Sequence, residues 1–350
     1  MKLALSVGSL VVMLLICEVT FRVAGIRAEY HRSRIDRVVP MAGKPTERIP
    51  YGFVPFATVI SVYDSNPRGY FAPGNTVWHL HNSVGWRDVE HDEKKAEGMF
   101  RILGLGDSYL WGQGVKSEDI CLTKLPGLLE EKLPGRRFES INAGLSAMNT
   151  VNQRNLLFER GLKYRPDLVI VHFVLNDVED DVFKEGPKIE FFTDYVSIYE
   201  STDALSGYSQ FWGWARQRYL RSFQARNYLQ QCIDSFSVNS EGWKQCRKAL
   251  GDIATICSSR DIRLLVVVFP FYYGLDGDYP FQSIHDTVWT HCKSLDVDVL
   301  DLRDRYRKYK GPEMWVHPTD QHPNEIAHGI AAESIADFLV VNASQLLPDR

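Results

Sequence analysis

The 350-residue sequence lacks the features that mark several large classes of protein. Its 40 basic and 44 acidic residues give a net charge of −4, so the composition offers no reason to expect nucleic acid as a partner. It has no His-Glu-x-x-His or Cys-x-x-Cys motif and no carboxylate cluster at ligand spacing, so no metal is expected. The Gly112-x-Gly114 stretch lacks the third glycine of a dinucleotide-binding fingerprint, and no cofactor is expected either. Internal repeats and low-complexity tracts are also missing.

Residues 1–26 differ from the rest of the chain. No charge occurs from Leu3 to Cys17, and the apolar character continues for about 24 residues, enough at ~1.5 Å each to cross a ~30 Å hydrocarbon layer. Glu18 and Arg22 lie four residues apart, so on a helix they share a face and can pair. Because no Ala-x-Ala cleavage site follows, we expect an uncleaved membrane anchor. A cleaved signal peptide and a buried core helix are the alternatives.

From residue 100 onward, predicted strands and helices alternate. The apolar pattern predicts strands at 101–106, 137–142, 167–174, 262–269 and 297–302. Helices are expected between and after them, at about 119–133, 150–162, 241–258, 280–295 and 324–341. Such alternation predicts a parallel sheet between two layers of helices, a three-layer α/β/α fold with right-handed crossovers.

Two regions do not follow this alternation. Residues 27–99 are expected to form a stalk, at 27–60, and a small β-hairpin arm, at 68–90. Residues 183–240 read as an insertion in which aromatic residues alternate with arginines. This insertion could be a lid that grips an acyl chain or sugar, or a helix resting on a membrane surface. The simpler alternative, which we favour, is a cap that builds its own small core.

Four short motifs carry the chemistry of the chain. They are Gly106-Asp107-Ser108, Asn142-Ala143-Gly144, Asn176-Asp177 and Asp320-x-His322. A serine at the end of a strand exposes its hydroxyl, and a distant histidine can serve as its base. The first three motifs each follow a predicted strand, and the fourth opens the last helix. Sites in parallel sheets gather at the carboxyl ends of the strands. We therefore expect these motifs to meet at one edge of the sheet.

The set of motifs resembles the SGNH (GDSL-type) hydrolase superfamily over residues 100–342. The arm, with Asn-Pro-Arg-Gly-Tyr-Phe at 66–71 and Asn-Ser-Val-Gly-Trp-Arg-Asp at 82–88, resembles that of bacterial membrane-anchored members. The resemblance implies a five-stranded parallel sheet in flavodoxin-like order. It also implies a serine esterase that cleaves carboxylic esters without metal or cofactor.

The resemblance assigns a role to each matching residue. Ser108 is the expected nucleophile, His322 its base, and Asp320 the group that orients the imidazole. The expected oxyanion hole consists of the backbone N–H groups of Ser108 and Gly144 and the side-chain amide of Asn176. In the commonest family pattern the acidic residue stands three before the histidine, where this chain has Thr319. A backbone carbonyl that orients His322 is therefore the alternative to Asp320.

Three activities remain compatible with these motifs. An ester hydrolase is expected first, acting on an acylated glycan or a lipid, with a slight preference for short acyl esters on envelope glycans that rests on the resemblance. An O-acyltransferase of the same fold would share the acyl-enzyme. A catalytically inactive, polysaccharide-binding module would be expected to have lost Ser108, His322 or Asn176, and all three are present.

The side of the membrane is the least determined expectation. The apolar run is followed by several arginines: Arg22, Arg27, Arg32, Arg34 and Arg37. By the positive-inside rule these arginines would keep the catalytic domain in the cytoplasm. The resemblance to anchored relatives argues for the outer side, which we favour. Cys232 and Cys246 could form a disulfide in an exported domain or remain two thiols. Of the histidines outside the motifs, His79 and His81 are expected on the hairpin surface, and His317 and His328 in surface or packing positions.

Overall fold

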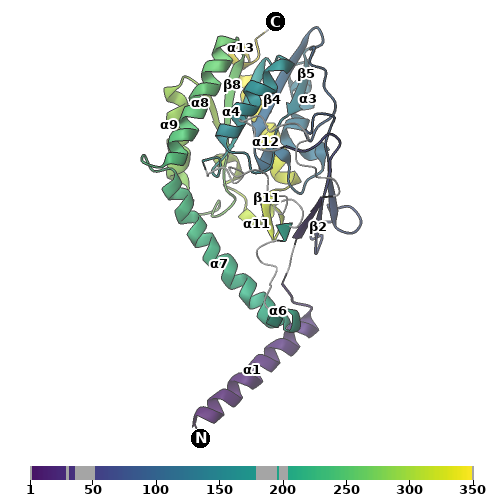
Figure 1. The fold of residues 1–350 in the computed structure, drawn as a ribbon, viewed down its shortest axis with the longest axis vertical. Coiled ribbons are helices and arrows are strands. Elements are labelled where there is room, and N and C mark those ends of the chain that lie inside the picture. The colour runs from purple at the N-terminus through teal and green to yellow at the C-terminus, as the bar shows by residue number, and fades with distance from the viewer. Residues whose placement is uncertain (1, 29–30, 36–51, 179–194, 197–203, 349–350) are drawn as a thin grey trace.

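A five-stranded parallel sheet lies at the centre of the molecule (Figure 1). The computed structural model describes residues 2–28, 31–35, 52–178, 195–196 and 204–348. The strand order of the five-stranded sheet is β5-β4-β6-β8-β9, which in chain order is the flavodoxin-like 2-1-3-4-5 arrangement. The strands are β4 (Met99–Gly106), β5 (Arg137–Asn142), β6 (Leu168–Val174), β8 (Arg263–Phe269) and β9 (Asp298–Asp301). The five predicted strands and the α/β class are thus confirmed.

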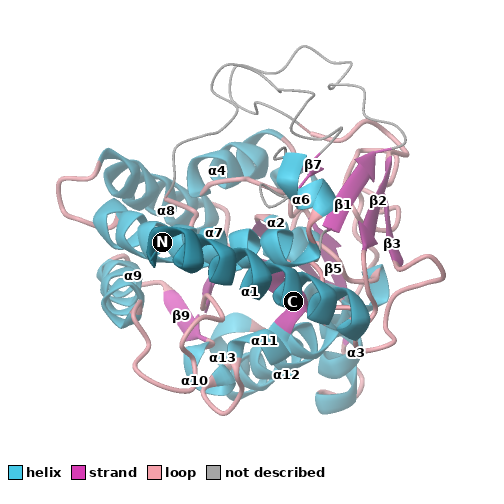
Figure 2. Ribbon diagram, turned by 90° about the horizontal axis from the view of Figure 1, so that it is seen from below, coloured by secondary structure: helices cyan, strands magenta, loops and turns pink. Residues whose placement is uncertain are grey.

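Helices cover both faces of this sheet. One face carries α4 (Thr150–Glu159), α8 (Glu241–Ser259) and α9 (Gln282–Ser294), and the other carries α3 (Cys121–Lys132), α12 (Glu325–Val341) and α13 (Ala343–Leu346), as Figure 2 shows. In β6, Val169, Val171 and Phe173 face the first layer, whereas Leu168 and Ile170 face the second. A strand buried on both faces needs a continuous apolar run, which explains the pattern seen in the sequence.

Shorter elements connect the layers and shape the edge where the strands end. They are α2 (Ser108–Trp111), η1 (Ser117–Asp119), η2 (Gly161–Tyr164), α10 (Arg303–Tyr306), α11 (Gly311–Met314), β10 (Trp315–His317) and β11 (Asp320–Pro323). Strands β10 and β11 pair antiparallel in a small hairpin just before α12. The hairpin therefore presents the fourth motif on a strand rather than on a helix terminus.

A second, antiparallel sheet has the order β3-β2-β1-β7, with β1 (His31–Ile35), β2 (Thr58–Tyr63), β3 (Thr76–Leu80) and β7 (Tyr195–Val196). The predicted hairpin is present, but the stalk expected at 27–60 was wrong in part, because β1 and the first residues of β2 lie inside it and pair with each other. The sequence of β2, Thr-Val-Ile-Ser-Val-Tyr, is rich in the β-branched residues that favour strands. Four of its six residues are buried, so this arm packs against the main domain.

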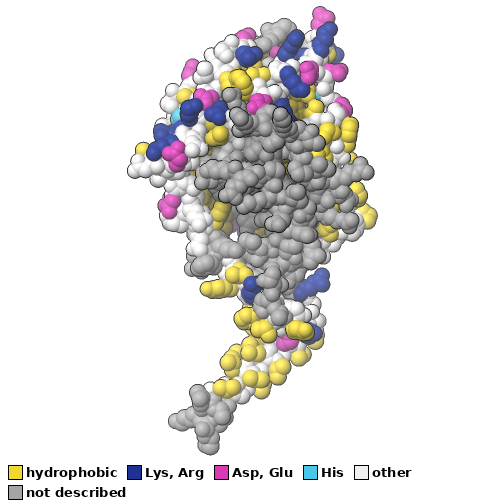
Figure 3. Space-filling model, viewed as in Figure 1, with side chains coloured by type: hydrophobic (Ala, Val, Ile, Leu, Met, Phe, Trp, Pro, Cys, Tyr) yellow, Lys and Arg dark blue, Asp and Glu magenta, His cyan; other side chains and the backbone are white. Residues whose placement is uncertain are grey.

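The N-terminal helix α1 (Lys2–Ala24) extends away from the domain (Figure 1). Most of its described apolar side chains, from Val7 to Val23, are exposed, as Figure 3 shows. Its end meets α7 (Gln210–Ser235), where the ring of Phe21 contacts Phe211 and Trp214 at 5.3 and 5.0 Å between centroids. Arg22 and Glu18 pair at 2.6 Å, as the spacing predicted. Of the expected insertion at 183–240, α6 (Ala204–Tyr208) and α7 are described, and much of its first part lies outside the described residues.

Candidate active site

Ser108 is the first residue of α2, and only Asp107 separates it from the end of β4. The Asp107 side chain caps this helix, accepting a hydrogen bond from the backbone N–H of Tyr109 at 2.8 Å. The turn from strand to helix is tight, since a methyl group at Gly106 would lie 2.8 Å from Cβ of Leu110. The local sequence thus holds Ser108 at the carboxyl end of β4, where sites of such sheets gather.

His322 and Asp320 are brought to Ser108 by strand β11. Residues two apart on a strand lie on the same face, so the two-residue spacing places the carboxylate beside the ring. His322 Nδ1 lies 2.5 Å from Asp320 Oδ1, and His322 Nε2 lies 2.9 Å from Ser108 Oγ. Thr319, at the commoner position for the acid, instead holds His317 through a 2.7 Å contact between Oγ1 and Nδ1. Asp320, rather than a backbone carbonyl, is the partner of the His322 ring.

The environment of His322 suits a base that also carries a proton. Burial lowers the pKa of His322, but the charge and hydrogen bond of Asp320 and the charge of Asp107 outweigh burial and raise it above its ordinary value. Burial is the main influence on Asp107, and it raises the pKa of that carboxyl. An imidazole paired with a buried carboxylate keeps its proton on Nδ1 and leaves Nε2 free to accept one.

The three expected oxyanion donors differ in availability. The backbone N–H of Ser108 begins a helix, where no intrahelical carbonyl can accept from it. The Asn176 side-chain amide, just after β6, donates to Asp107 Oδ2 at 3.2 Å and has a second hydrogen. The Gly144 N–H, in contrast, donates to Asn142 Oδ1 at 2.9 Å. Gly144 can serve an oxyanion only if this hydrogen bond is shared or exchanged.

Packing explains why position 144 is glycine. A methyl group there would lie 2.7 Å from the backbone nitrogen of Trp111, so the missing Cβ permits close packing on α2. Asn142 reinforces that packing by donating to the carbonyl of Leu110 at 3.0 Å. In the same loop Ala147 has a φ of 63°, in the left-handed region that few non-glycine residues adopt. No sequence pattern signalled this conformation.

The N-terminal arm contributes side chains to the site that sequence reasoning missed. Tyr63, at the end of β2, donates to Asp320 Oδ2 at 2.8 Å. The buried Arg87 side chain donates to the carbonyls of Trp111, Gly112 and Val115, which follow Ser108 in α2 and the next turn. Arginine can satisfy several carbonyls at once because its guanidinium presents five N–H donors. The arm therefore braces both the nucleophile helix and the orienting carboxylate.

The histidines of the hairpin correct an expectation. His79 and His81 were expected on the surface, but both are buried against α2. His81 Nε2 accepts from the Trp111 indole N–H at 3.1 Å, and the His79 ring stacks on the same indole at 4.5 Å. The surface expectation was wrong because the arm docks on the domain, and a single strand pattern cannot show which of its faces is covered.

Other predicted residues have structural contacts. Asp177 accepts from the Val174 N–H at 3.3 Å and from Gln153 at 3.1 Å, holding the loop after β6. His317 and His328 are buried and pack within the domain. Among the described residues all six cysteines are free thiols, so the disulfide alternative for Cys232 and Cys246 does not hold. The same described part of the chain has no group of three or more potential metal ligands close together.

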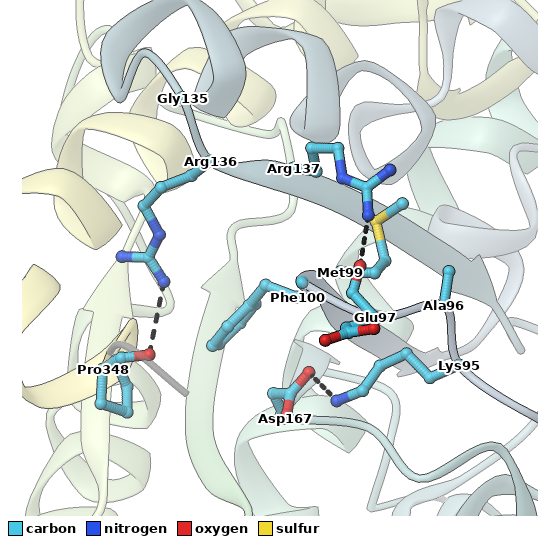
Figure 4. Close-up of a pocket in the computed structure, with 11 residues that line it drawn as sticks. Lys95, Ala96, Glu97, Met99, Phe100, Gly135, Arg136, Arg137, Asp167 and Pro348 are labelled. Carbon is cyan, nitrogen blue, oxygen red and sulfur yellow. Dashed lines mark hydrogen bonds and ion pairs between the residues drawn. The ribbon is translucent and has the colours of Figure 1, made fainter.

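A cavity of about 430 Å³ lies at the other edge of the sheet (Figure 4). It is lined by residues at the amino ends of the strands, whereas Ser108 stands at a carboxyl end. Its cations are already held: Arg136 donates to the carbonyls of Leu347 and Pro348, and Lys95 pairs with Asp167. None of the predicted site residues lines this cavity.

The α/β fold thus brings together a serine, a histidine and an acid in the arrangement typical of serine hydrolases. Residues 105–330, more than half of the chain, match the GDSL-like Lipase/Acylhydrolase family. The chain belongs to this family of carboxylic ester hydrolases. No curated protein matches its sequence.

Several solved structures share parts of the fold at low identity. A two-domain esterase active on acetylated mannans, co-crystallised with mannopentaose, is 16% identical, with a TM-score of 0.44. The match covers 72% of this chain and 51% of the esterase, so this chain spans about half of the length of that esterase. TesA is 12% identical over 68% of this chain and 97% of its own, with a TM-score of 0.43. The acetyl xylan esterase AlAXEase is 16% identical, and the match covers 69% of this chain and 100% of that one, also with a TM-score of 0.43.

Proposed function

We propose that this protein is a serine esterase that hydrolyses carboxylic esters through an acyl-enzyme on Ser108. The observation that carries the proposal is the unbroken series of contacts from the Ser108 hydroxyl through the His322 ring to the Asp320 carboxylate. A serine hydroxyl is a poor nucleophile near neutral pH and needs a base within about 2.6–3.2 Å. His322 Nε2 meets that requirement at 2.9 Å.

In this mechanism His322 takes the Ser108 proton as the oxygen attacks the ester carbonyl carbon. The tetrahedral intermediate collapses, the bond to the alcohol oxygen breaks, and His322 gives the proton to the leaving alcohol. Water then attacks the acyl-enzyme with His322 again as base, which releases the acid and restores the Ser108 hydroxyl. Asp320 keeps the other ring proton on Nδ1 and stabilises the imidazolium that forms in each step.

The negative oxygen of each intermediate needs donors that are in place beforehand. The Ser108 N–H and the second amide hydrogen of Asn176 are the two donors supported by the geometry. The Gly144 N–H is a third donor if the intermediate displaces Asn142 Oδ1, which now accepts from it. Displacing one hydrogen bond for a stronger, charge-assisted one is favourable.

Labelling with a fluorophosphonate probe tests the activated serine. The full chain in detergent should form an adduct that mass mapping places on Ser108, and the adduct should disappear in Ser108→Ala and His322→Ala. Ser65→Ala is a matched control, because Ser65 also contacts a histidine, with Oγ 2.9 Å from His317 Nε2, but that ring is held by a threonine rather than a carboxylate. Absence of an adduct in the folded wild-type protein would favour the binding-module alternative.

For the substrate, we propose a short acyl ester on an envelope glycan. The support is the resemblance of the arm motifs to anchored relatives that act on envelope material. Hydrolysis of p-nitrophenyl acetate should exceed that of p-nitrophenyl palmitate, and turnover confined to long acyl chains would contradict the proposal. Incubation with a donor ester and an oligosaccharide separates hydrolase from acyltransferase, since acylated sugar as the main product requires the second activity.

We also propose that α1 anchors the protein in a membrane, with the hydrolase domain outside the cytoplasm. Within the described residues, Ser6–Ala24 is one helix of 19 residues with a mean hydropathy of 2.0, long and apolar enough to cross a bilayer, and a signal sequence passes the same test. Mass analysis of the mature N-terminus decides between anchor and signal, because a signal would be missing from the purified chain. Protease treatment of intact spheroplasts then reports the side.

A further inference from the structure

Tyr63 belongs to the arm and not to the residues 105–330 that match the family. Its side chain is almost fully buried, at 2% exposure, and its hydroxyl donates to Asp320 Oδ2 at 2.8 Å. The Asp320 side chain is buried as well, at 2% exposure. A hydrogen bond between two buried side chains so far apart in the chain forms only when the arm is docked on the domain.

The two oxygens of the Asp320 carboxylate have separate partners. Oδ1 faces His322, accepting from its backbone N–H at 3.2 Å and contacting ring Nδ1 at 2.5 Å. Oδ2 faces the Tyr63 hydroxyl. Rotation of the carboxylate about its terminal bond, a soft torsion in isolation, would break contacts on both sides. Tyr63 therefore fixes the plane in which Oδ1 meets the imidazole.

The Tyr63 ring itself has little freedom. It stacks on Phe71 with 4.4 Å between ring centroids and 9° between ring planes, and it lies 5.3 Å from the His317 ring. A methyl group at Gly114 would lie 2.4 Å from the Tyr63 hydroxyl oxygen, so the loop behind α2 closes over it. Burial and the nearby charge of Asp320 raise the pKa of Tyr63, so the hydroxyl stays protonated and remains a donor.

We propose that Tyr63 is a positioning residue for catalysis, supplied by the N-terminal arm, that holds the Asp320 carboxylate in the orientation His322 requires. This inference rests on the proposed esterase function for its catalytic consequence but not for its geometry. It predicts that the arm is part of the active site rather than a spacer between anchor and domain. Within the described part of the chain, the charged or titratable groups that face His322 are Asp320 and Asp107, and the Tyr109 ring meets it edge-on at 5.7 Å.

Tyr63→Phe removes the hydroxyl and keeps the packed ring. The matched control is Tyr70→Phe, because Tyr70 lies in the same arm and donates to another carboxylate, Asp119 Oδ2, at 2.7 Å. The first readout is an NMR titration of His322 in the full chain, using histidine labelled with ¹⁵N. The second is the pH dependence of kcat/KM for p-nitrophenyl acetate.

Without the Tyr63 hydrogen bond, more of the negative charge of Asp320 faces the imidazolium. The pKa of His322 should therefore rise by about 0.5 to 1 in Tyr63→Phe, with the acid limb of kcat/KM moving the same way. The value of kcat should fall about 10-fold with KM little changed, the scale of one hydrogen bond to a charged group. Tyr70→Phe should change neither the titration nor kcat.

The two readouts keep the inference separate from the proposed function. An unchanged His322 titration in Tyr63→Phe overturns the positioning role, whatever the activity. A shifted titration in a protein that forms no fluorophosphonate adduct supports the positioning of Asp320 and refutes only the esterase function. If Tyr70→Phe shifts His322 as much as Tyr63→Phe does, the effect is general loosening of the arm and the proposal fails. Unfolded protein lowers the signal intensity but does not move the pKa of the folded fraction.

Discussion

Replacing Asp320 by alanine should both slow the enzyme and move its pH profile, in a direction that the structure determines. In the wild-type protein, burial lowers the pKa of His322, and two contributions from Asp320 and one from Asp107 raise it above the ordinary value of 6.5. His322 must be neutral to accept the Ser108 proton. The acid limb of kcat/KM, which reports the base of the free enzyme, should therefore lie above 6.5.

Asp320→Ala removes the two larger favourable contributions and leaves burial opposed by Asp107 alone. Burial is the largest single influence on His322, so the pKa of the base should fall below 6.5 and the acid limb should move to lower pH. The rate should fall by about 10²–10⁴, because the imidazole loses both its tautomer and the stabilisation of its charged form. A slower enzyme that stays active in more acid solution is the expected signature.

The assay is hydrolysis of p-nitrophenyl acetate between about pH 4.5 and 9, with kcat and KM determined at each pH. Asp301→Ala provides the control, because Asp301 also pairs with a buried histidine, with both carboxylate oxygens 3.0 Å from His285 Nδ1. That pair involves β9, which lies three strands from β4, so its loss should leave the acid limb in place. An Asp320→Ala profile with the wild-type limb would refute the role of Asp320 as partner of the base.

Three further predictions concern Asn176 of the expected oxyanion hole, Gly144 in the loop after β5 and the buried His172. Asn176→Ala should lower kcat about 10²–10³-fold with little change in KM, since the lost donor serves the intermediate; an unchanged kcat would remove Asn176 from the oxyanion hole. Gly144→Ala should lower the unfolding free energy by about 1–3 kcal/mol, because the new methyl group would lie 2.7 Å from the Trp111 backbone nitrogen; urea unfolding measures this, and unaltered stability would show that the loop yields freely. Burial lowers the pKa of His172 to about 3, so between 6.5 and that value the unfolded chain binds a proton that the folded protein does not, and stability falls as the pH falls, by about 1.4 kcal/mol per pH unit. His172→Leu should therefore gain about 1.4 kcal/mol on the wild type between pH 7.5 and 5.5, whereas an equal loss in both proteins would place the pH dependence elsewhere.

Local sequence was sufficient for the architecture of the central domain. The continuous apolar run of β6 indicated a strand buried on both faces, and helices do lie over both. Alternating strand and helix periods then left a parallel sheet as the arrangement that buries every apolar face. The four motifs could be placed at one edge because three of them follow strands, and parallel strands end on the same side.

The contacts of individual site residues could be predicted from the sequence only in part. Asp320 could be paired with His322 once β11 was seen to be a strand, since residues two apart share a face. Gly144 was assigned from its motif, but its N–H is engaged by Asn142, a contact that depends on how the loop folds over α2. The motif gives the type of residue and its approximate place, and not the partner of each hydrogen atom.

The sequence by itself determined the order of the strands and helices along the chain and the apolar N-terminal helix, because each of these depends on the period or spacing of neighbouring residues. The expected roles of Ser108 as nucleophile and His322 as base came from the resemblance of their motifs to a family. Only the tertiary structure decided that the arm is part of the site. Tyr63, His81 and Arg87 reach Asp320 and α2 across long stretches of chain, through hydrogen bonds between buried groups. Such contacts form when two surfaces that are distant in sequence dock on each other, and no local sequence pattern in either surface indicates which surface it will contact.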